Sequence, residues 1–455
     1  METWRRLRFQ TALVDILASR LHEVGKNPVY EIADRLLACK ETIEKRLHET
    51  ERDLYPESPV LMLYDLTNTY LEGVCQNNEL AHHGPSKEKR SDCCLVTLAL
   101  LVNSRGFPIF SQIYSGNQSE PDTLIQVLNR LDADSRGKLP GLRPTIVMDR
   151  GIATKANLAL ICEREYPYVV IERRAAEKDF LDEFSLKRED FERISTSDPK
   201  AKVYVKGVST PIGMHVLVFS EKREEKEQAM DVLKKKRFQE DFQKIQNAIK
   251  NGYVKDSQKI SRRIGRLLER YPSVASCHEM ELVCHENEVR GVVLKAKEEQ
   301  QKKESLHGCY VIETSHQDLS PKEVWKIYST ITRVEYAFKC LKTDLGIRPI
   351  YHQLAKRTEA HLFISVLAYH LLIGIENSLQ DQGDHREWQT VKNILSTHQR
   401  STVIMKDDQG LVHQIRLSGI PEPEQQTIYR KLGVKDRCEK KYKIVNPTNV
   451  VTKEK

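Results

Sequence analysis

The sequence lacks the features of secreted and membrane-spanning proteins. Its first residues, Met1 to Arg6, carry charges with no apolar run behind them, so no signal peptide is predicted. No stretch approaches the ~20 apolar residues that a membrane-spanning helix needs. The longest apolar segment, around Leu362 to Ile375, contains His370 and is predicted to be a buried helix. We therefore expect a cytoplasmic protein with no membrane partner.

The sequence also lacks the cysteine patterns of metal-binding or disulfide-rich folds. None of its ten cysteines belongs to a CxxC pair. Cys277-His278 and Cys284-His285 fit no common zinc spacing, so ordinary strand residues are the favoured interpretation. We predict reduced thiols in a cytosolic protein.

A strong excess of one charge is missing as well. The 455 residues carry 72 basic and 65 acidic side chains, a net charge of +7. This excess permits a nucleic-acid partner but does not require one. With 39% hydrophobic and 30% charged residues, the composition is that of a globular protein, and the length predicts two or three structural units.

Hydrophobic periodicity predicts a helical start followed by an α/β region. Residues 1–50 have helical spacing, and an N-terminal segment is predicted over 1–58. Residues 59–171 are predicted to contain strands and helices in a mixed sheet. The expected strands cover 60–66, 93–103, 108–115, a run ending at Asp149, and 168–171, and the expected helices cover 120–133 and 153–164.

The pattern changes between residues 172 and 310, which we predict to be an insertion. Strands are expected near 202–206, 214–219 and 280–295. Between them, a highly charged stretch over 220–270 predicts a helical hairpin with a solvated outer face. The ordered core is expected to resume over 311–380, and 381–455 form a C-terminal segment.

A single helix is predicted to begin at Ser320 and to carry Glu335. Ser320, Pro321 and Glu323 fit an N-cap, a first-turn proline and a capping box. An apolar stripe continues from Val324 to Leu345 at steps of three and four residues. The neighbouring polar stripe contains Tyr328, Thr332, Glu335, Lys339 and Lys342.

Three carboxylates from separate elements form the candidate site. Asp65 and Asp149 end strand-like apolar runs, and Glu335 lies on the predicted helix. Mg²⁺ and Mn²⁺ prefer carboxylate oxygens, and two such ions can stabilise both reacting oxygens of phosphoryl transfer. The alternative for each residue alone is that it caps an element or pairs with a nearby base.

The chain resembles the DDE-type transposases of bacterial insertion sequences, in the insertion-sequence-four-like group and its insertion-sequence-1634-type branch. That group has a signature around its glutamate: Tyr, two residues, Arg, three residues, Glu, six residues, Lys. Tyr328, Glu335 and Lys342 match this signature, whereas Ile331 occupies the position of the arginine. The blocks that carry the resemblance are Tyr64 to Gly73, Gly84 to Asp92, Gly116 to Thr123, Val147 to Gly151, Gly346 to His352, and Glu359 to Phe363.

The resemblance implies an RNase H-like catalytic core, with the first aspartate on the first strand and the second after the fourth. It also implies a β-rich insertion before the glutamate. Asp65, Asp149 and Glu335 would be catalytic and would hold two Mg²⁺ or Mn²⁺ ions. The implied partners are double-stranded DNA, as inverted repeats and target, and a second copy of the chain on that DNA. The setting would be the cytoplasm of a bacterium or archaeon, at the nucleoid.

Five further residues are candidates for contact with DNA: Tyr328, Lys342, Lys87, Arg90 and Arg150. For Lys342 a solvated helix lysine is an equal alternative, and for Lys87 and Arg90 a surface turn. Arg150 could instead neutralise Asp149.

The predicted function is cleavage at the ends of an insertion sequence and strand transfer into target DNA. Because only 64 residues precede Asp65, and because Ile331 replaces the arginine, a truncated, non-catalytic regulator of transposition is the alternative. A nuclease without strand transfer is a third.

Overall fold

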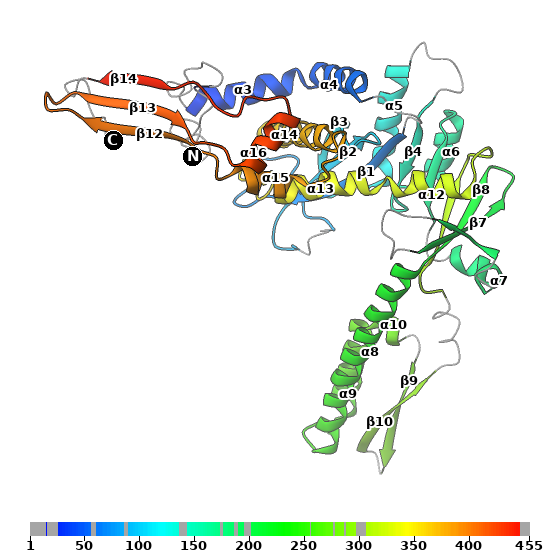
Figure 1. Cartoon of the computed structure of the whole chain (residues 1–455). Helices are drawn as coiled ribbons and strands as arrows, with labels where there is room; N and C mark the ends of the chain where they lie inside the picture. Colours follow the sequence, from blue (N-terminus) through cyan, green and yellow to red (C-terminus); the bar gives the residue numbers. More distant parts are fainter. Residues whose placement is uncertain are drawn as a thin grey trace. The chain divides into compact units, whose positions relative to one another are not determined.

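Figure 1 shows the helices and strands of the structure, a computed structural model. The chain divides into two compact units. Unit 1 comprises residues 1–146 and 330–455, and unit 2 comprises residues 147–329. The residues that the structure describes are 15, 26–55, 61–85, 90–135, 143–172, 176–185, 190–194, 202–254, 256–275, 278–285, 288–296 and 306–445.

The sheet of unit 1 is built on an antiparallel meander. Strand β1 (Leu61–Tyr70) pairs with β2 (Leu95–Val102), and β2 pairs with β3 (Pro108–Ser115). Every residue of β2 is buried, as its unbroken apolar sequence predicts. The turn between β2 and β3 places Gly106 at a φ of +89°, which favours glycine.

The strand order of the sheet is β3-β2-β1-β4-β5-β11-β8-β7-β6. The boundary between the two units falls inside β4 (Thr145–Met148). Helix α5 (Leu124–Ser135), entered through the short 3₁₀ turn η2 (Pro121–Thr123), precedes β4. In unit 2, α6 (Lys155–Glu163) connects β4 to β5 (Tyr168–Ile171), a strand–helix–strand connection typical of parallel neighbours.

The remaining strands of that sheet in unit 2 pair antiparallel. Strand β11 (Cys309–Thr314) lies between β5 and β8 (Met214–Ser220), and β7 (Val203–Ser209) lies between β8 and β6 (Glu192–Ile194). The short elements η3 (Ala176–Phe180) and α7 (Leu181–Ser185) precede β6. Helices and a mixed sheet together confirm the α/β fold class.

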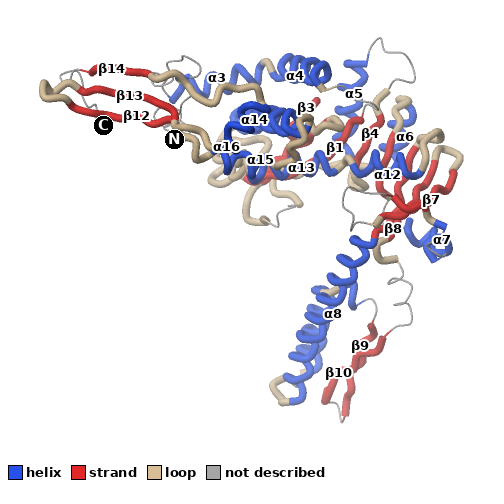
Figure 2. Tube along the Cα trace, viewed as in Figure 1, coloured by secondary structure: helices blue, strands red, loops and turns tan. Residues whose placement is uncertain are grey.

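The charged stretch forms a helical hairpin with its own small core (Figures 1 and 2). Helix α8 (Glu221–Lys250) packs against α9 (Ser257–Arg270), the short α10 (Pro272–Ala275), and the two-stranded sheet of β9 (His278–His285) and β10 (Glu288–Ala296). The shared core contains Phe238, Phe242, Ile245, Ile249, Ile260, Ile264, Leu267 and Val292. The helical spacing of the sequence, which runs from Leu233 to Ile249, is that of the buried face only from Phe238 onward, because Leu233 is 48% exposed.

In unit 1, helix α14 (Ala355–Gln380) is the central helix, in contact with α3 (Lys26–Ala38), α13 (Thr332–Thr343) and β3. It is long and apolar enough to meet the length and composition criterion for a membrane span, contrary to the expectation that no segment would. Packing explains its apolarity, because 61% of its most apolar window is buried. His370, on this helix, contacts Glu51 of α4 (Lys40–Leu54), so the predicted buried helix is confirmed.

The C-terminal part of unit 1 contains α15 (Trp388–Leu395), α16 (Pro423–Lys431) and a second sheet. Strand β13 (Val412–Ser418) lies between β12 (Arg400–Lys406) and β14 (Lys441–Val445), as Figure 2 shows. Asp15 contacts Arg400, Arg416 and Lys441 and so ties an N-terminal residue to this sheet.

The predicted single helix carrying Glu335 is wrong. Helix α12 (Pro321–Ser329) ends before Ile331, and α13 begins at Thr332. Three consecutive β-branched residues, Thr330 to Thr332, weaken helix propensity at the break. The predicted capping box is confirmed, because Ser320 and Glu323 exchange side-chain-to-backbone hydrogen bonds of 2.8 and 3.3 Å.

Two histidines in unit 1 predict an acid-sensitive fold. His352 Nε2 lies 3.1 Å from His361 Nδ1, and burial, followed by repulsion from His352, lowers the pKa of His361 to about 4. The unfolded chain, with a histidine pKa of about 6.5, therefore binds a proton that the folded chain excludes. We expect the free energy of unfolding to fall between about pH 6.5 and pH 4, by up to about 3 kcal/mol from this group.

Urea denaturation at pH 7.5 and pH 5 measures this effect. His361→Phe should reduce the loss of stability between the two pH values, whereas His385→Phe, in the same unit and outside the pair, should leave it unchanged. An equal loss in His361→Phe and the unaltered protein would contradict the assignment.

Candidate functional site

Asp65 lies in the middle of β1, which corrects the prediction that it ends a strand: the strand continues through the buried residues Thr67, Asn68 and Thr69. It is the single acidic residue of β1 and is half-buried, whereas its neighbours Tyr64 and Leu66 are buried. Its Oδ1 accepts the backbone N–H of Leu66 at 2.7 Å. This hydrogen bond holds one oxygen of the half-buried carboxylate in place.

Tyr64 supports the strand from the opposite face. Its hydroxyl donates to Thr123 Oγ1 at 2.8 Å, and burial raises the pKa of this phenol well above its ordinary value. Tyr64 is therefore a packing residue of the core. Tyr70, in contrast, is half-buried and lies under the Arg90 guanidinium, whose carbon is 4.7 Å from the ring centre.

Glu335 lies in the first turn of α13, and its side chain is exposed. The amino end of a helix favours negative charge, so this position supports an ionised carboxylate. Helix α13 packs against β1, the strand of Asp65, within unit 1. Lys342 lies in the last turn of the same helix and is half-buried.

Asp149 follows directly after β4, as expected, and is exposed. Its Oδ1 accepts the backbone N–H of Arg150 at 2.7 Å, and its carbonyl accepts the N–H of Ile152 at 3.1 Å. Asp149 belongs to unit 2, whereas Asp65 and Glu335 belong to unit 1. The meeting of all three carboxylates stays a prediction.

The predicted DNA-contacting residues are distributed over both units. Arg90 donates to both oxygens of Asp92 at 2.8 Å, so its charge is already engaged. Tyr328 lies in α12, in a different helix from Glu335, and its ring centre is 6.2 Å from that of Tyr310. Arg150 is exposed in unit 2. Lys87 lies outside the described residues.

Unit 2 also contains a cavity of about 630 Å³ that the sequence did not reveal. Apolar side chains of α6 and β5 form much of its wall. Its polar lining includes Arg150, Lys155, Tyr168, Glu172 and Glu313.

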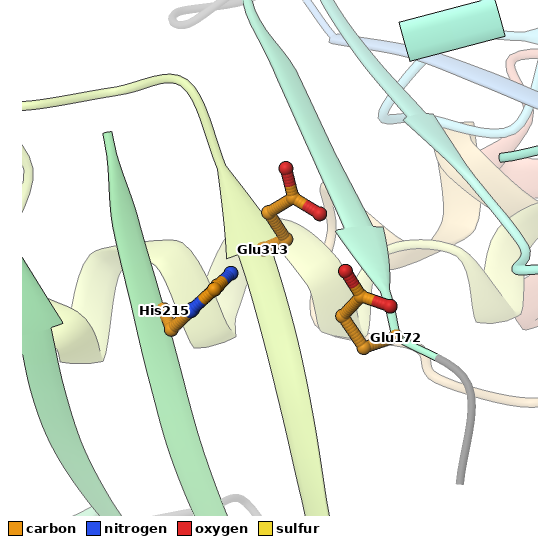
Figure 3. A group of neighbouring side chains, drawn as sticks. All are labelled: Glu172, His215 and Glu313. Carbon is orange, nitrogen blue, oxygen red and sulfur yellow. The ribbon is translucent and has the colours of Figure 1, made fainter. Parts of the chain in front are cut away.

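Beside this cavity, Glu172, His215 and Glu313 form a cluster that shares no residue with the predicted trio (Figure 3). One ligand atom from each lies within 4.8 Å of the others, and all three side chains are half-buried. His215 stands opposite Glu313 in the β8–β11 register, and Glu172 follows β5. The alternation of side chains along a strand could have assigned His215 and Glu313 each to one face of its own strand. Only the pairing of the strands brings the two residues together.

Eight cysteines in the described part of the chain are free thiols, as expected. They are Cys39, Cys75, Cys93, Cys94, Cys162, Cys309, Cys340 and Cys438. His278, Cys284 and His285 lie in β9, which confirms the strand interpretation for them, and Cys277 lies outside the described residues.

The chain matches a protein family over most of its length. A family model described as "Transposase DDE domain" matches residues 73–371, which include Asp149 and Glu335 and begin beyond Asp65. The chain therefore belongs to the family of transposase DDE domains. A search of curated proteins gives no significant match.

Among solved structures, the chain is similar to one described as "Cryo-EM structure of piggyBac transposase synaptic complex with hairpin DNA (SNHP)". The identity is 9%, the TM-score is 0.36, and the match covers 86% of this chain and 77% of that one.

Proposed function

We propose that the chain is a DNA transposase of the insertion-sequence-four-like group, in its insertion-sequence-1634-type branch. It would cut DNA at the ends of its element and join the released 3′-hydroxyls to target DNA. The observation that carries the proposal is the family match over residues 73–371, a range that contains Asp149 and Glu335, two of the three predicted carboxylates.

The donor set supports a site for two Mg²⁺ or Mn²⁺ ions. Asp65, Asp149 and Glu335 offer only carboxylate oxygens, the ligands that these ions prefer. When bound, the ions supply positive charge to the attacking and leaving oxygens of the phosphodiester.

The side chains of the protein would position the metal ligands and the DNA. Asp65 would hold its oxygen in place through its hydrogen bond to the Leu66 backbone. Glu335 would remain ionised at the amino end of α13. Lys342, Tyr328, Lys87, Arg90 and Arg150 would position the DNA backbone, a role that carries no sequence specificity by itself.

One outer face of the hairpin fits duplex DNA as a partner. The helix α9 buries Ile260, Ile264 and Leu267, and its cationic side chains are exposed on the other side. At about 100° per residue these cations fall within an arc of about 100°, along about 16 Å of helix. They are Lys259, Arg262, Arg263, Arg266 and Arg270, of which Arg270 also pairs with Asp241 at 3.1 Å. We call this set the basic stripe.

The basic stripe predicts a salt-dependent contribution to DNA binding. Arg262→Ala/Arg263→Ala/Arg266→Ala should weaken duplex binding and reduce the slope of log K against log [salt] by up to about 2.7, if all three contact phosphates. Fluorescence anisotropy at several salt concentrations measures the slope. Lys244→Ala is the control, because Lys244 already pairs with Asp241 at 2.8 Å. An unchanged slope in the triple variant would remove the basic stripe from the DNA interface.

An activity assay tests the proposed function. The purified protein, Mn²⁺ and a duplex carrying an element end should yield nicked strands and then joined products, and chelation should stop both. The end sequence for this duplex is to be read from inverted repeats, which the proposed function predicts on both sides of the gene.

The assay also separates the other candidates. Ile331, only 8% exposed, occupies the arginine position of the family signature, which favours a non-catalytic regulator of transposition. DNA that is bound but never cut would support that regulator. Nicking without joining would support a nuclease.

A further inference from the structure

We propose that Glu172, His215 and Glu313 form a second metal site, selective for a transition-metal dication such as Zn²⁺ or Co²⁺. It lies wholly within unit 2 and is separate from the carboxylate trio of the proposed function. Three elements supply one ligand each: the end of β5, strand β8 and strand β11 (Figure 3).

The geometry is that of a prearranged ligand set. One oxygen or nitrogen atom from each side chain lies within 4.8 Å of the others, so rotation of the side chains can bring all three around one ion. Hydrogen bonding between strands fixes the backbone of the cluster. Glu313 and His215 are paired residues of β11 and β8, and the Glu172 N–H donates to the Val311 carbonyl at 2.9 Å.

The charges favour a cation. The two carboxylates lie within 4.8 Å of each other in a half-buried setting, where like charges repel. Burial lowers the pKa of His215, although the charge of Glu172 opposes this shift. A neutral imidazole has a nitrogen lone pair available for a metal ion.

Tyr168 orients one of the ligands. Its hydroxyl donates to Glu313 Oε1 at 2.6 Å, and burial, followed by this hydrogen bond, raises the pKa of the phenol. Tyr168 therefore remains a hydrogen-bond donor at neutral pH. Outer partners of this kind fix the direction of a ligating carboxylate and commonly change metal affinity by about 10- to 100-fold.

The ligand types distinguish this site from the proposed catalytic one. An imidazole nitrogen with two carboxylates suits Zn²⁺, Co²⁺ or Ni²⁺, whereas sites of oxygen ligands alone suit Mg²⁺ and Mn²⁺. The adjacent cavity, lined by Glu172 and Glu313, gives an ion a route to the cluster and leaves room for a water ligand.

Metal binding by a catalytically disabled chain tests the proposal. Full-length Asp65→Ala/Asp149→Ala/Glu335→Ala protein, freed of metal by chelation, should bind one equivalent of Zn²⁺ by calorimetry. Co²⁺ should produce visible absorption bands that Zn²⁺ abolishes. Adding His215→Ala should remove saturable binding, and adding Tyr168→Phe should weaken it by about tenfold.

The controls separate lost ligands from lost folding. His307→Ala replaces a half-buried histidine of unit 2 that pairs with Asp231, and it should bind Zn²⁺ normally. Glu172→Gln preserves side-chain shape and should still lose binding, with an unchanged circular dichroism spectrum. Wild-type affinity in a folded His215→Ala or Glu172→Gln variant, or no stoichiometric Zn²⁺ in the starting protein, overturns the proposal.

The two sites fail independently in these experiments. Zn²⁺ binding by the triple-alanine chain does not require DNA cleavage. Equally, Mn²⁺-dependent nicking by wild-type protein would stand even if the cluster bound nothing.

Discussion

Asp149→Ala should abolish Mn²⁺-dependent DNA nicking while leaving the protein folded. In the proposed function Asp149 is one of three carboxylates that hold the catalytic ions. We expect the cleavage rate to fall by about 10³-fold or more, which corresponds to about 4 kcal/mol of transition-state stabilisation. Single-turnover cleavage of an end-labelled duplex measures the rate.

The exposure of Asp149 makes this variant informative. An exposed aspartate whose side chain accepts a hydrogen bond from the next backbone N–H can be replaced with a change in the free energy of unfolding of about 0.5 kcal/mol. Asp318→Ala, another exposed aspartate of unit 2, should cut at the wild-type rate. Equal cleavage by the Asp149 and Asp318 variants would exclude Asp149 from the chemistry.

Glu51→Leu should destabilise unit 1 by about 3 kcal/mol, the second large effect that we predict. Glu51 of α4 and His370 of α14 are both buried, and Glu51 Oε1 lies 2.5 Å from His370 Nδ1. Replacing one member leaves the other buried without its partner. The midpoint and slope of urea denaturation give the change in the free energy of unfolding.

A double-mutant cycle separates the pair from its surroundings. Glu51→Leu/His370→Leu removes both polar groups and should recover much of the stability lost in either single variant. Glu41→Leu, on the exposed face of the same helix, should change stability by about 0.5 kcal/mol or less. Additive losses in the double variant would show that the two side chains do not stabilise each other.

Much of the sheet could be predicted from local sequence. The bounds of β3 and β5 are those expected, because each is a short apolar run with a clear break at both ends. The buried face of α8 follows from the spacing of Phe238, Phe242, Ile245 and Ile249. The C-terminal sheet of β12, β13 and β14 was not predicted, since much of it is exposed and its apolar pattern is weak.

The break between α12 and α13 shows the limit of periodicity. The apolar stripe continues in phase from Val324 through Ile331 to Phe338, so the pattern predicts one helix. Backbone preference at Thr330 to Thr332 prevails over that pattern. The same interruption separates Tyr328 from the helix that carries Glu335.

Local sequence predicts which strands carry the candidate catalytic aspartates, but it does not predict a cluster that forms only when strands pair. Asp149 follows its strand as its apolar run predicts, whereas Asp65 lies inside β1 because the strand continues through polar but buried residues. The bounds of the five segments predicted from the sequence, 1–58, 59–171, 172–310, 311–380 and 381–455, remain predictions. Glu172, His215 and Glu313 are distant in sequence, and register alone makes them neighbours. No local signal marks such a cluster.

The most direct test of the central claim is anomalous X-ray scattering from crystals of the wild-type protein grown with Mn²⁺. The proposed site predicts two manganese peaks about 3.5–4 Å apart, bound by carboxylate oxygens of Asp65, Asp149 and Glu335. Manganese bound without one of these three residues, in a DNA complex as well as in the free protein, would contradict the account.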